Sequence, residues 1–177
     1  MSFDLKSLIR SIPNYPKKGI IFRDITTLIE HPEGFCQSIK EIADKYRNKG
    51  ITHVAGIEAR GFIFGAAVAI ELGVGFIPVR KAGKLPGETL GQNYALEYGV
   101  DTIEIHANVV NENDNILLID DLIATGGTAI AAVNLFRRTG ASLKYAAFII
   151  DLPDIGGANK LREHNIDVSH LMSFEGH

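Results

Sequence analysis

Several features of membrane, secreted and nucleic-acid-binding proteins are missing from this sequence. Its 177 residues contain a single cysteine, Cys36, which excludes an internal disulfide and favours a reducing compartment. No apolar run approaches the roughly 18 residues needed to cross a bilayer, and the N-terminus lacks the basic and apolar parts of a secretory signal. A net charge of −3 disfavours broad contact with a nucleic-acid backbone. We therefore expect a single cytoplasmic domain, residues 1–177, that contacts neither membrane nor nucleic acid.

Familiar ligand-binding signatures are missing as well. The chain has no G-x-x-x-x-G-K-[ST] loop and no G-x-G-x-x-G turn, which disfavours a nucleoside triphosphatase and a Rossmann dinucleotide enzyme. Its six histidines show no metal-ligand spacing, so we interpret them as structural. Basic residues nevertheless cluster at Arg80, Lys81 and Lys84. On an acidic background, this local cluster indicates a small anionic ligand.

Short apolar strands alternate with apolar helical patterns along the chain, which predicts an α/β fold with a mostly parallel, twisted sheet and helices on both faces. Cys36 lies in one helical pattern, so we expect a buried thiol. Residues 81–92 lack periodicity and predict a mobile loop. The expected strands are residues 53–57, 76–79, 94–98, 102–105, 116–119, 145–150 and 168–172, and the expected helices are 4–12, 32–50, 62–72, 127–138 and 159–164.

The segment at residues 116–129 is the most informative part of the chain. Four apolar residues of a buried strand precede the adjacent carboxylates Asp120 and Asp121, and a small-residue turn then leads into a helix. Free backbone N–H groups and the helix dipole at such a turn bind an anion. Carboxylates would repel a phosphate but suit hydroxyl groups, a hydrated divalent cation, or both. These features predict a sugar-phosphate site, since an ordinary strand-to-helix turn leaves the paired aspartates unexplained. The turn consists of Ala124, Thr125, Gly126, Gly127 and Thr128.

Five segments carry a resemblance to a known family. The order of four apolar residues, two acids and Thr-Gly-Gly-Thr resembles the phosphoribosyl pyrophosphate motif of the type I phosphoribosyltransferases. Four further segments resemble the adenine-specific members of that family, and together the matches cover about residues 10–130. These further segments are residues 19–26, 56–62, 80–89 and 94–99.

The resemblance implies both an architecture and a reaction. It implies an N-terminal hood within residues 1–30 that binds the base, a mobile catalytic loop with an adjoining strand at 81–99, and a homodimer whose interface lies near Arg60. The reaction is the transfer of the 5-phosphoribosyl group from phosphoribosyl pyrophosphate to adenine, with Mg²⁺, giving AMP and pyrophosphate in purine salvage.

Roles for individual residues follow from the same resemblance. Asp120 and Asp121 are expected to hold the ribose hydroxyls and, directly or through water, the Mg²⁺, while the turn at 124–128 cradles the 5′-phosphate. The Glu58–Ala59 peptide is expected to be cis, with its N–H toward pyrophosphate. Further contacts to phosphoribosyl pyrophosphate or AMP are expected from Glu58, Ala59, Lys84 and Tyr98. The expected catalytic residues are Glu97, Arg60, Arg80 and Lys81.

Recognition of the base is expected from the irregular segment at residues 19–26. The resemblance implies that Phe22 stacks on adenine and that main-chain groups of Ile21 and Arg23 read its edge. One N–H and one C=O match adenine, whereas a 6-oxopurine would leave both mismatched. Glu97 is expected either to donate a proton to N7 of the purine or to hold the loop closed.

Two other interpretations remain open. The first is a phosphoribosyltransferase for another purine base, against which residues 22–24 speak. The second is a non-catalytic regulator that senses phosphoribosyl pyrophosphate. Such regulators usually carry a DNA-binding extension, for which we expect no room before residue 13, and an altered loop, whereas this loop keeps Arg80, Lys81 and Glu97.

Overall fold

A seven-stranded sheet forms the centre of the molecule in the computed structural model, which describes residues 2–176. Its strand order is β5-β6-β4-β3-β7-β8-β9, with five parallel strands and the antiparallel pair β5 and β6 at one edge. The mostly parallel sheet expected from the sequence is therefore confirmed. The strands are β3 (His53–Ile57), β4 (Gly75–Lys81), β5 (Thr89–Ala95), β6 (Val100–His106), β7 (Asn115–Ile123), β8 (Ser142–Asp151) and β9 (Asp167–Ser173).

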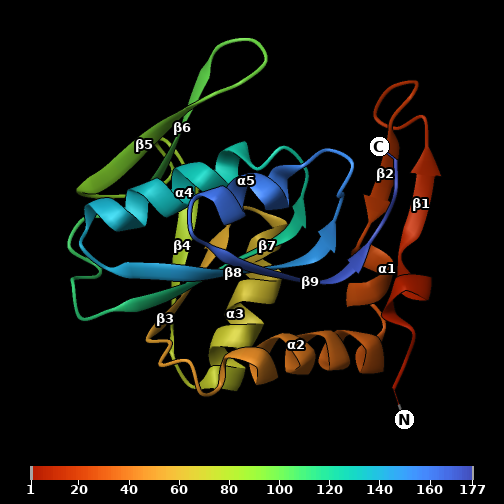
Figure 1. Cartoon of the computed structure of the whole chain (residues 1–177), viewed down its shortest axis with the longest axis horizontal. Coiled ribbons are helices and arrows are strands. Elements are labelled where there is room, and N and C mark those ends of the chain that lie inside the picture. Colours follow the sequence, from red (N-terminus) through yellow and green to blue (C-terminus); the bar gives the residue numbers. More distant parts are fainter. Residues whose placement is uncertain (1, 177) are drawn as a thin grey trace.

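Helices cover both faces of this sheet, as expected (Figure 1). Ile116 and Leu118 of β7 pack towards α4 and α5, and Leu117 and Ile119 pack towards α2 and α3. A strand buried on both faces has to be apolar without interruption, which explains the run that marks β7 in the sequence. No helix within residues 2–176 has the length and apolarity needed to cross a bilayer. The helices that cover the sheet are α2 (Pro32–Tyr46), α3 (Arg60–Leu72), α4 (Gly127–Arg138) and the short α5 (Gly157–Glu163).

The first thirty residues differ from the expected helix at 4–12. Only the 3₁₀ turn η1 (Leu5–Leu8) forms, and the chain then extends as β1 (Arg10–Pro13), which pairs with β2 (Ile21–Asp24) in a separate two-stranded sheet. The helical spacing of the apolar residues does not produce a helix here. A 3₁₀ turn forms and the chain then extends, because β2 supplies the backbone hydrogen-bond partners of residues 10–13. This hairpin continues into α1 (Thr26–Ile29), and we call residues 10–24 the hood.

The hood is fastened at its base by Asp24. Its carboxylate accepts a hydrogen bond from the Thr26 N–H at 2.9 Å and pairs with Arg10 at 2.5 Å. Hydrogen bonds from Thr26, followed by that from Arg10, lower the pKa of Asp24 to about 2. This carboxylate is therefore charged at neutral pH and ties both hood strands to the start of α1.

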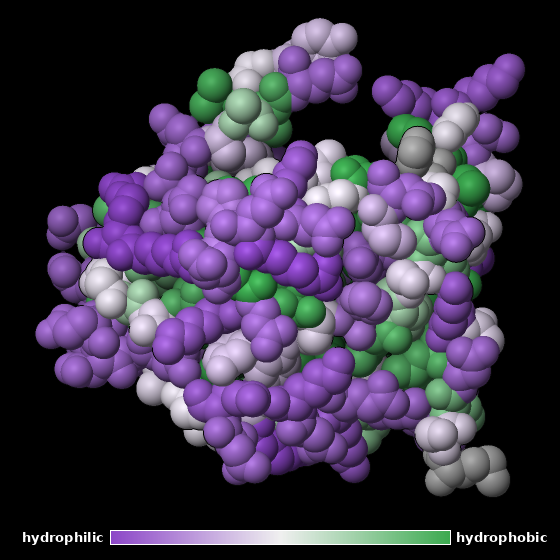
Figure 2. All heavy atoms as spheres, viewed as in Figure 1, coloured by the Kyte–Doolittle hydropathy of each residue, from purple (hydrophilic) through white to green (hydrophobic). Residues whose placement is uncertain are grey.

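The β5–β6 hairpin corrects two boundaries taken from the sequence. Of the strand expected at residues 94–98, only residues 94 and 95 belong to β5; residues 96–98 form a turn, which the bond from the Leu96 N–H to the Gly99 carbonyl closes at 2.9 Å. Residues 81–92 are not one loop either, since β5 begins at Thr89 and pairs with β6 along its length. The hairpin projects on the same side of the molecule as the hood (Figure 1). Figure 2 shows hydrophobic side chains on this projecting part, where Leu96, Tyr98 and Val100 are exposed.

Candidate active site

Two adjoining cavities lie at the carboxyl ends of the central strands. A cavity of about 160 Å³ is formed by Asp120, Phe148 and the turn at residues 124–128. A second of about 180 Å³ is formed by the ends of β3 and β4, with Tyr94 from β5. Asp120 and Thr128 line both cavities, so the two spaces make one elongated site. Ligands of open parallel sheets bind at this edge.

The turn at residues 124–128 is held in shape by α5. Gly126 has φ +85°, a left-handed conformation that favours glycine, and α4 begins at the next residue. Gly157 donates its N–H to the Ala124 carbonyl at 2.9 Å, and a Cβ on Gly157 would lie 2.4 Å from that oxygen. Gly157 thus allows α5 to support the turn from behind. The first N–H groups of α4 have no partner within the helix, so this end of the cavity suits an anion.

The two aspartates lie inside β7, which continues beyond the expected end at residue 119 to Ile123 because β8 pairs with it that far. Asp120 accepts a hydrogen bond from the Asp121 N–H at 2.8 Å and faces both cavities. Burial, and then the neighbouring Asp121 carboxylate, raise the pKa of Asp120 well above its usual range. A cationic or hydroxyl-bearing ligand would therefore stabilise the ionised form of this carboxylate.

Arg60 connects the acidic pair to the hood. Its Nε lies 2.9 Å from an oxygen of buried Asp121, and its guanidinium lies 5.4 Å from the centre of the Phe22 ring. Gly61 permits this arrangement, since a Cβ there would lie 2.8 Å from an Asp120 oxygen. Arg60 therefore contacts Asp121 and Phe22. The basic cluster around Arg80 and Lys84 contacts a different carboxylate.

That other carboxylate belongs to Glu58. It accepts the Lys81 N–H at 2.8 Å, lies 3.3 Å from the Arg80 Nε, and forms an ion pair with the Lys84 ammonium. Burial acts to raise the pKa of Glu58, but the hydrogen bonds from Lys84 and the Lys81 amide, with the charges of Lys84 and Arg80, lower it overall. The Glu58–Ala59 peptide is cis, as the resemblance implied. Two of the expected cationic side chains, those of Arg80 and Lys84, therefore gather around an internal anion, whereas the Lys81 ammonium lies 3.6 Å from Asp101.

Glu97 and Tyr98 lie apart from these cavities. Both occupy the exposed turn of the β5–β6 hairpin, and neither lines the elongated site. Tyr94 lines it instead, with its hydroxyl 3.4 Å from Asp101. Sequence reasoning gave Tyr94 no role, although it begins the recognised segment at residues 94–99.

The three hood residues point in different directions. Phe22 faces Arg60 and meets the Tyr15 ring edge-on, with ring centres 5.3 Å apart. Ile21 is partly exposed, and the Arg23 side chain turns away to bond with Ser11 at 2.6 Å. Tyr15 is a further neighbour of the base-binding candidate that the sequence did not single out.

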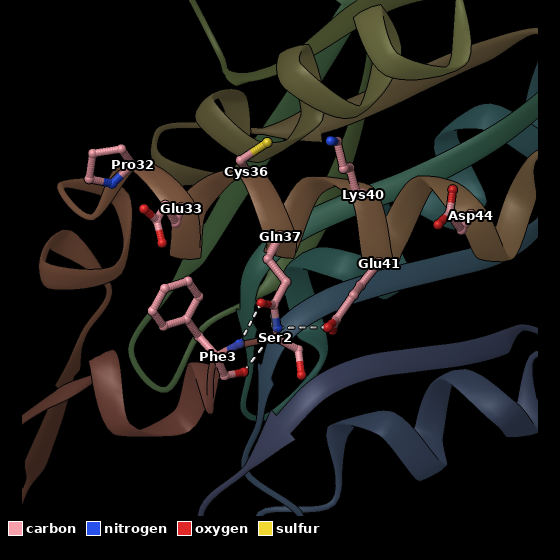
Figure 3. A pocket seen from close by; sticks show the side chains of 9 residues that line it. All are labelled: Ser2, Phe3, Pro32, Glu33, Cys36, Gln37, Lys40, Glu41 and Asp44. Atoms are coloured by element: carbon pink, nitrogen blue, oxygen red, sulfur yellow. Dashed lines mark hydrogen bonds between the residues drawn. The ribbon is translucent and has the colours of Figure 1, made fainter.

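A larger groove of about 700 Å³ runs along α2 and contains none of the expected site residues (Figure 3). Gln37 bonds to both the N–H and the carbonyl of Phe3 there, at 2.7 and 2.9 Å, and so fixes the N-terminal segment. Cys36 lies on this exposed face, so the expected burial of its thiol is wrong. The buried face of α2 is formed by the positions around Ile39 and Ile42.

Comparisons with known proteins show what the chain is similar to as a whole. Residues 26–169 match the phosphoribosyl transferase domain family. The chain is 56% identical over 173 residues to the adenine phosphoribosyltransferase of Actinobacillus succinogenes, covering 98% of this chain and 96% of the relative. It is 57% identical to that of Haemophilus influenzae, with the same coverage.

Solved structures show the same similarity. The adenine phosphoribosyltransferase of Thermoanaerobacter pseudethanolicus superposes with a TM-score of 0.91 at 43% identity, covering 97% of this chain and 98% of that one. The Saccharomyces cerevisiae enzyme, in complex with adenine and an imino-altritol bisphosphate, gives a TM-score of 0.88 at 39% identity, covering 95% of this chain and 96% of that one.

Proposed function

The chain belongs to the adenine phosphoribosyltransferases, and from this premise we propose how its residues divide the work of the reaction. It is an enzyme of purine salvage that transfers the 5-phosphoribosyl group of phosphoribosyl pyrophosphate to adenine, giving AMP and pyrophosphate. One observation carries the assignment of the site: the elongated cavity joins an anion-binding turn to an acidic pair, a basic cluster and, through Arg60, the hood.

The sugar phosphate occupies the space lined by the turn and the acidic pair. The main-chain N–H groups and hydroxyls of residues 124–128 hold the 5′-phosphate. Asp120 accepts hydrogen bonds from ribose hydroxyls, and Asp121 keeps Arg60 in place. The raised pKa of Asp120 supports this assignment. It means that the ionised carboxylate is disfavoured in the unliganded site, and hydrogen-bond donors from a ligand would offset that free-energy cost.

The basic cluster holds the pyrophosphate. Arg80, Lys81, Lys84 and the N–H of Ala59 are the binding groups. Pyrophosphate replaces Glu58 as the partner of Arg80, Lys84 and the Lys81 N–H, and the Lys81 ammonium turns to it from Asp101. As the lone pair of N9, in the adenine tautomer that carries its proton on N7, attacks C1 of the ribose, the C1–O bond breaks and its electron pair leaves with pyrophosphate, while the N7 proton passes to a base. Positive charge then grows on the sugar and negative charge on the leaving group, so fixed charges at both ends stabilise the transition state.

A Mg²⁺ ion fits the donor set of this site. No cluster of three metal-binding side chains occurs within residues 2–176, but Mg²⁺ is commonly held by one or two carboxylates together with substrate phosphates. Asp120 and Asp121, directly or through water, would hold it, and when bound it neutralises charge on the pyrophosphate.

Adenine lies against Phe22, with Ile21 and Arg23 main-chain groups at its edge. Adenine offers an acceptor at N1 and a donor at N6, and one N–H and one C=O satisfy both. A 6-oxopurine reverses this pattern and leaves two buried mismatches.

An assay of AMP formation tests the whole assignment. With adenine, phosphoribosyl pyrophosphate and Mg²⁺ we expect turnover, whereas hypoxanthine, guanine and xanthine should be rejected by a factor of about 10⁴. Chelation of Mg²⁺ should abolish turnover, and its return should restore it. Turnover with another base would favour the other specificity, and binding of phosphoribosyl pyrophosphate without turnover would favour the regulator.

Glu97 is proposed to act once the hairpin closes over the substrates. Closure would bury Leu96 and Tyr98, whose side chains are 47% and 88% exposed in this structure. We expect Glu97→Gln to lower kcat by about 10²-fold, as for loss of a general acid–base group that takes up the N7 proton during AMP synthesis and returns it in the reverse reaction, with little change in either KM. Steady-state kinetics with both substrates measure this, and Glu88→Gln at the base of the loop is the control. An unchanged kcat would remove Glu97 from the chemistry, and a rise in KM alone would make it a latch.

The protein is proposed to be a homodimer joined through α3, which begins at Arg60. Ile63, Ala66 and Ile70 follow one another on the exposed side of this helix, and Ile70 is 81% exposed. Such an apolar stripe marks a contact surface. We expect Ile70→Glu to convert the dimer to a monomer in sedimentation equilibrium, whereas Val109→Glu, at another exposed apolar site, should leave the dimer intact. A native chain that sediments as a monomer would refute the interface.

We also propose that residues 1–177 form a single domain and that the protein works in the cytoplasm. The two core clusters on opposite faces of one sheet support the single domain. The lone cysteine is compatible with a reducing compartment.

A further inference from the structure

The hood strand β2 is held from behind by the segment that follows β9. Side chains alternate along a strand, so Phe22 faces the site and Arg23 faces the opposite way. The Arg23 guanidinium lies 4.4 Å from the centre of the Phe174 ring and donates to the Glu175 carbonyl at 3.4 Å. Figure 1 shows the C-terminal end of the chain running beside β2.

Phe174 is itself fixed to the main sheet. Its N–H donates to the Asp151 carbonyl at the end of β8 at 3.1 Å, and the Gly176 N–H donates to the Asp154 carboxylate at 2.7 Å. Its partly buried ring packs against the core and carries a second cation, the Lys6 ammonium, at 4.7 Å. The ring is therefore a rigid platform with cations from two parts of the N-terminal region on it.

The hood depends on such contacts because β1 and β2 pair only with each other among the described strands. No ladder hydrogen bond therefore joins the hood to the seven-stranded sheet. The Nε of Arg23 is buried without a hydrogen-bond partner within residues 2–176, so the aromatic face adds to the bonds with Ser11 and Glu175 in holding the guanidinium at this position.

We propose that Phe174 is a positioning residue for the purine base, through which residues 174–176 hold β2 in register with the carboxyl edge of the sheet. The inference rests on the proposed function, in which Ile21, Phe22 and Arg23 contact adenine. A base that stacks on one side chain and bonds to the flanking peptides needs all three at fixed positions. Small displacements of such groups are costly, although Phe174 touches no substrate.

Phe174→Leu tests this positioning role. We expect the KM for adenine to rise about 10-fold, as for the loss of two ring–cation contacts, while the KM for phosphoribosyl pyrophosphate stays at the native value. Hydrogen exchange should accelerate at residues 10–24 and remain native in β3 and β7. Phe174→Tyr, which keeps the ring, should restore both measurements.

Matched variants separate positioning from general stability. Met172→Ala removes a buried side chain of β9 and should lower Tm without changing the KM for adenine. If Phe174→Leu does not fold, Lys6→Gln removes only the exposed cation, and a rise of about 3-fold in the KM for adenine is expected. Native exchange in the hood, or an equal rise of both KM values, would overturn the proposal. Hydrogen exchange reports whether Phe174 holds the hood even if adenine is not the substrate. Failure of the proposed function would therefore be distinguished from failure of this inference.

Discussion

The substitution Asp120→Asn is expected to make the unliganded protein more stable and the enzyme nearly inactive. Burial and the adjacent Asp121 raise the pKa of Asp120, so its charged form weakens the folded state at neutral pH. Asparagine keeps the oxygen that accepts the Asp121 N–H and removes the charge. Replacing a destabilising functional group typically raises the free energy of unfolding by about 1 kcal/mol. For a chain of this size, that gain raises Tm by about 2–4 °C. We expect kcat/KM for phosphoribosyl pyrophosphate to fall by about 10³-fold, because an oriented electrostatic group is lost.

The pH dependence of this gain has a definite sign. A carboxyl whose folded pKa is raised adds stability at low pH, and that contribution is lost as the pH rises through the folded pKa. The Tm difference between variant and native chain should therefore be largest at neutral pH and vanish below about pH 3, where both the folded and the unfolded state carry the proton. Thermal scans across this range measure it, with the exposed Asp44→Asn as control. A variant less stable than the native chain at pH 7 would contradict the raised pKa.

Arg60→Ala is expected to have the second largest effect. It removes the cation paired with buried Asp121 and the contact with Phe22, so both the acidic pair and the hood lose a partner. We expect kcat/KM to fall by about 10²–10³-fold, with a loss of stability of about 1 kcal/mol that is limited by the partial exposure of the guanidinium. Arg60→Lys should recover part of the activity, because it keeps the charge but not the planar fork.

A double-mutant cycle with Asp120→Asn tests the origin of this effect. The Arg60 charge favours the ionised form of Asp120, so the stability cost of Arg60→Ala should shrink once Asp120 is neutral. Arg47→Ala, which removes an exposed paired arginine far from the site, should leave kcat/KM unchanged. Additive stability changes in the cycle would show that Arg60 and Asp120 do not interact.

Local patterns allowed much of the site to be predicted, and long-range contacts account for what was missed. The turn at residues 124–128 and the acidic pair follow from one continuous segment, so the sequence displays them directly. The pairing of Arg60 with Asp121, in contrast, arises only when α3 meets β7. Tyr94 and Gly157 were missed for the same reason, because each reaches the site from another element.

The fold shows the same division. The apolar run at residues 116–119 and the helical spacing at 127–138 were sufficient for β7 and α4, because burial on both faces or on one face imposes these patterns. Residues 4–12 gave the wrong element, since the same spacing serves a 3₁₀ turn followed by a strand whose partner lies beyond residue 20. Strand pairing of this kind overrides local propensity.

The strand order also has a consequence for synthesis on the ribosome. β7, which carries the acidic pair, lies between β3 and β8, although β4, β5 and β6 leave the ribosome before it. Until residues 115–123 emerge, β3 has one unpaired edge, and exposed edges can pair with other chains. The nascent chain therefore passes through a stage that is prone to aggregation and has no substrate site, and ligands can protect the protein only after β7 has entered the sheet.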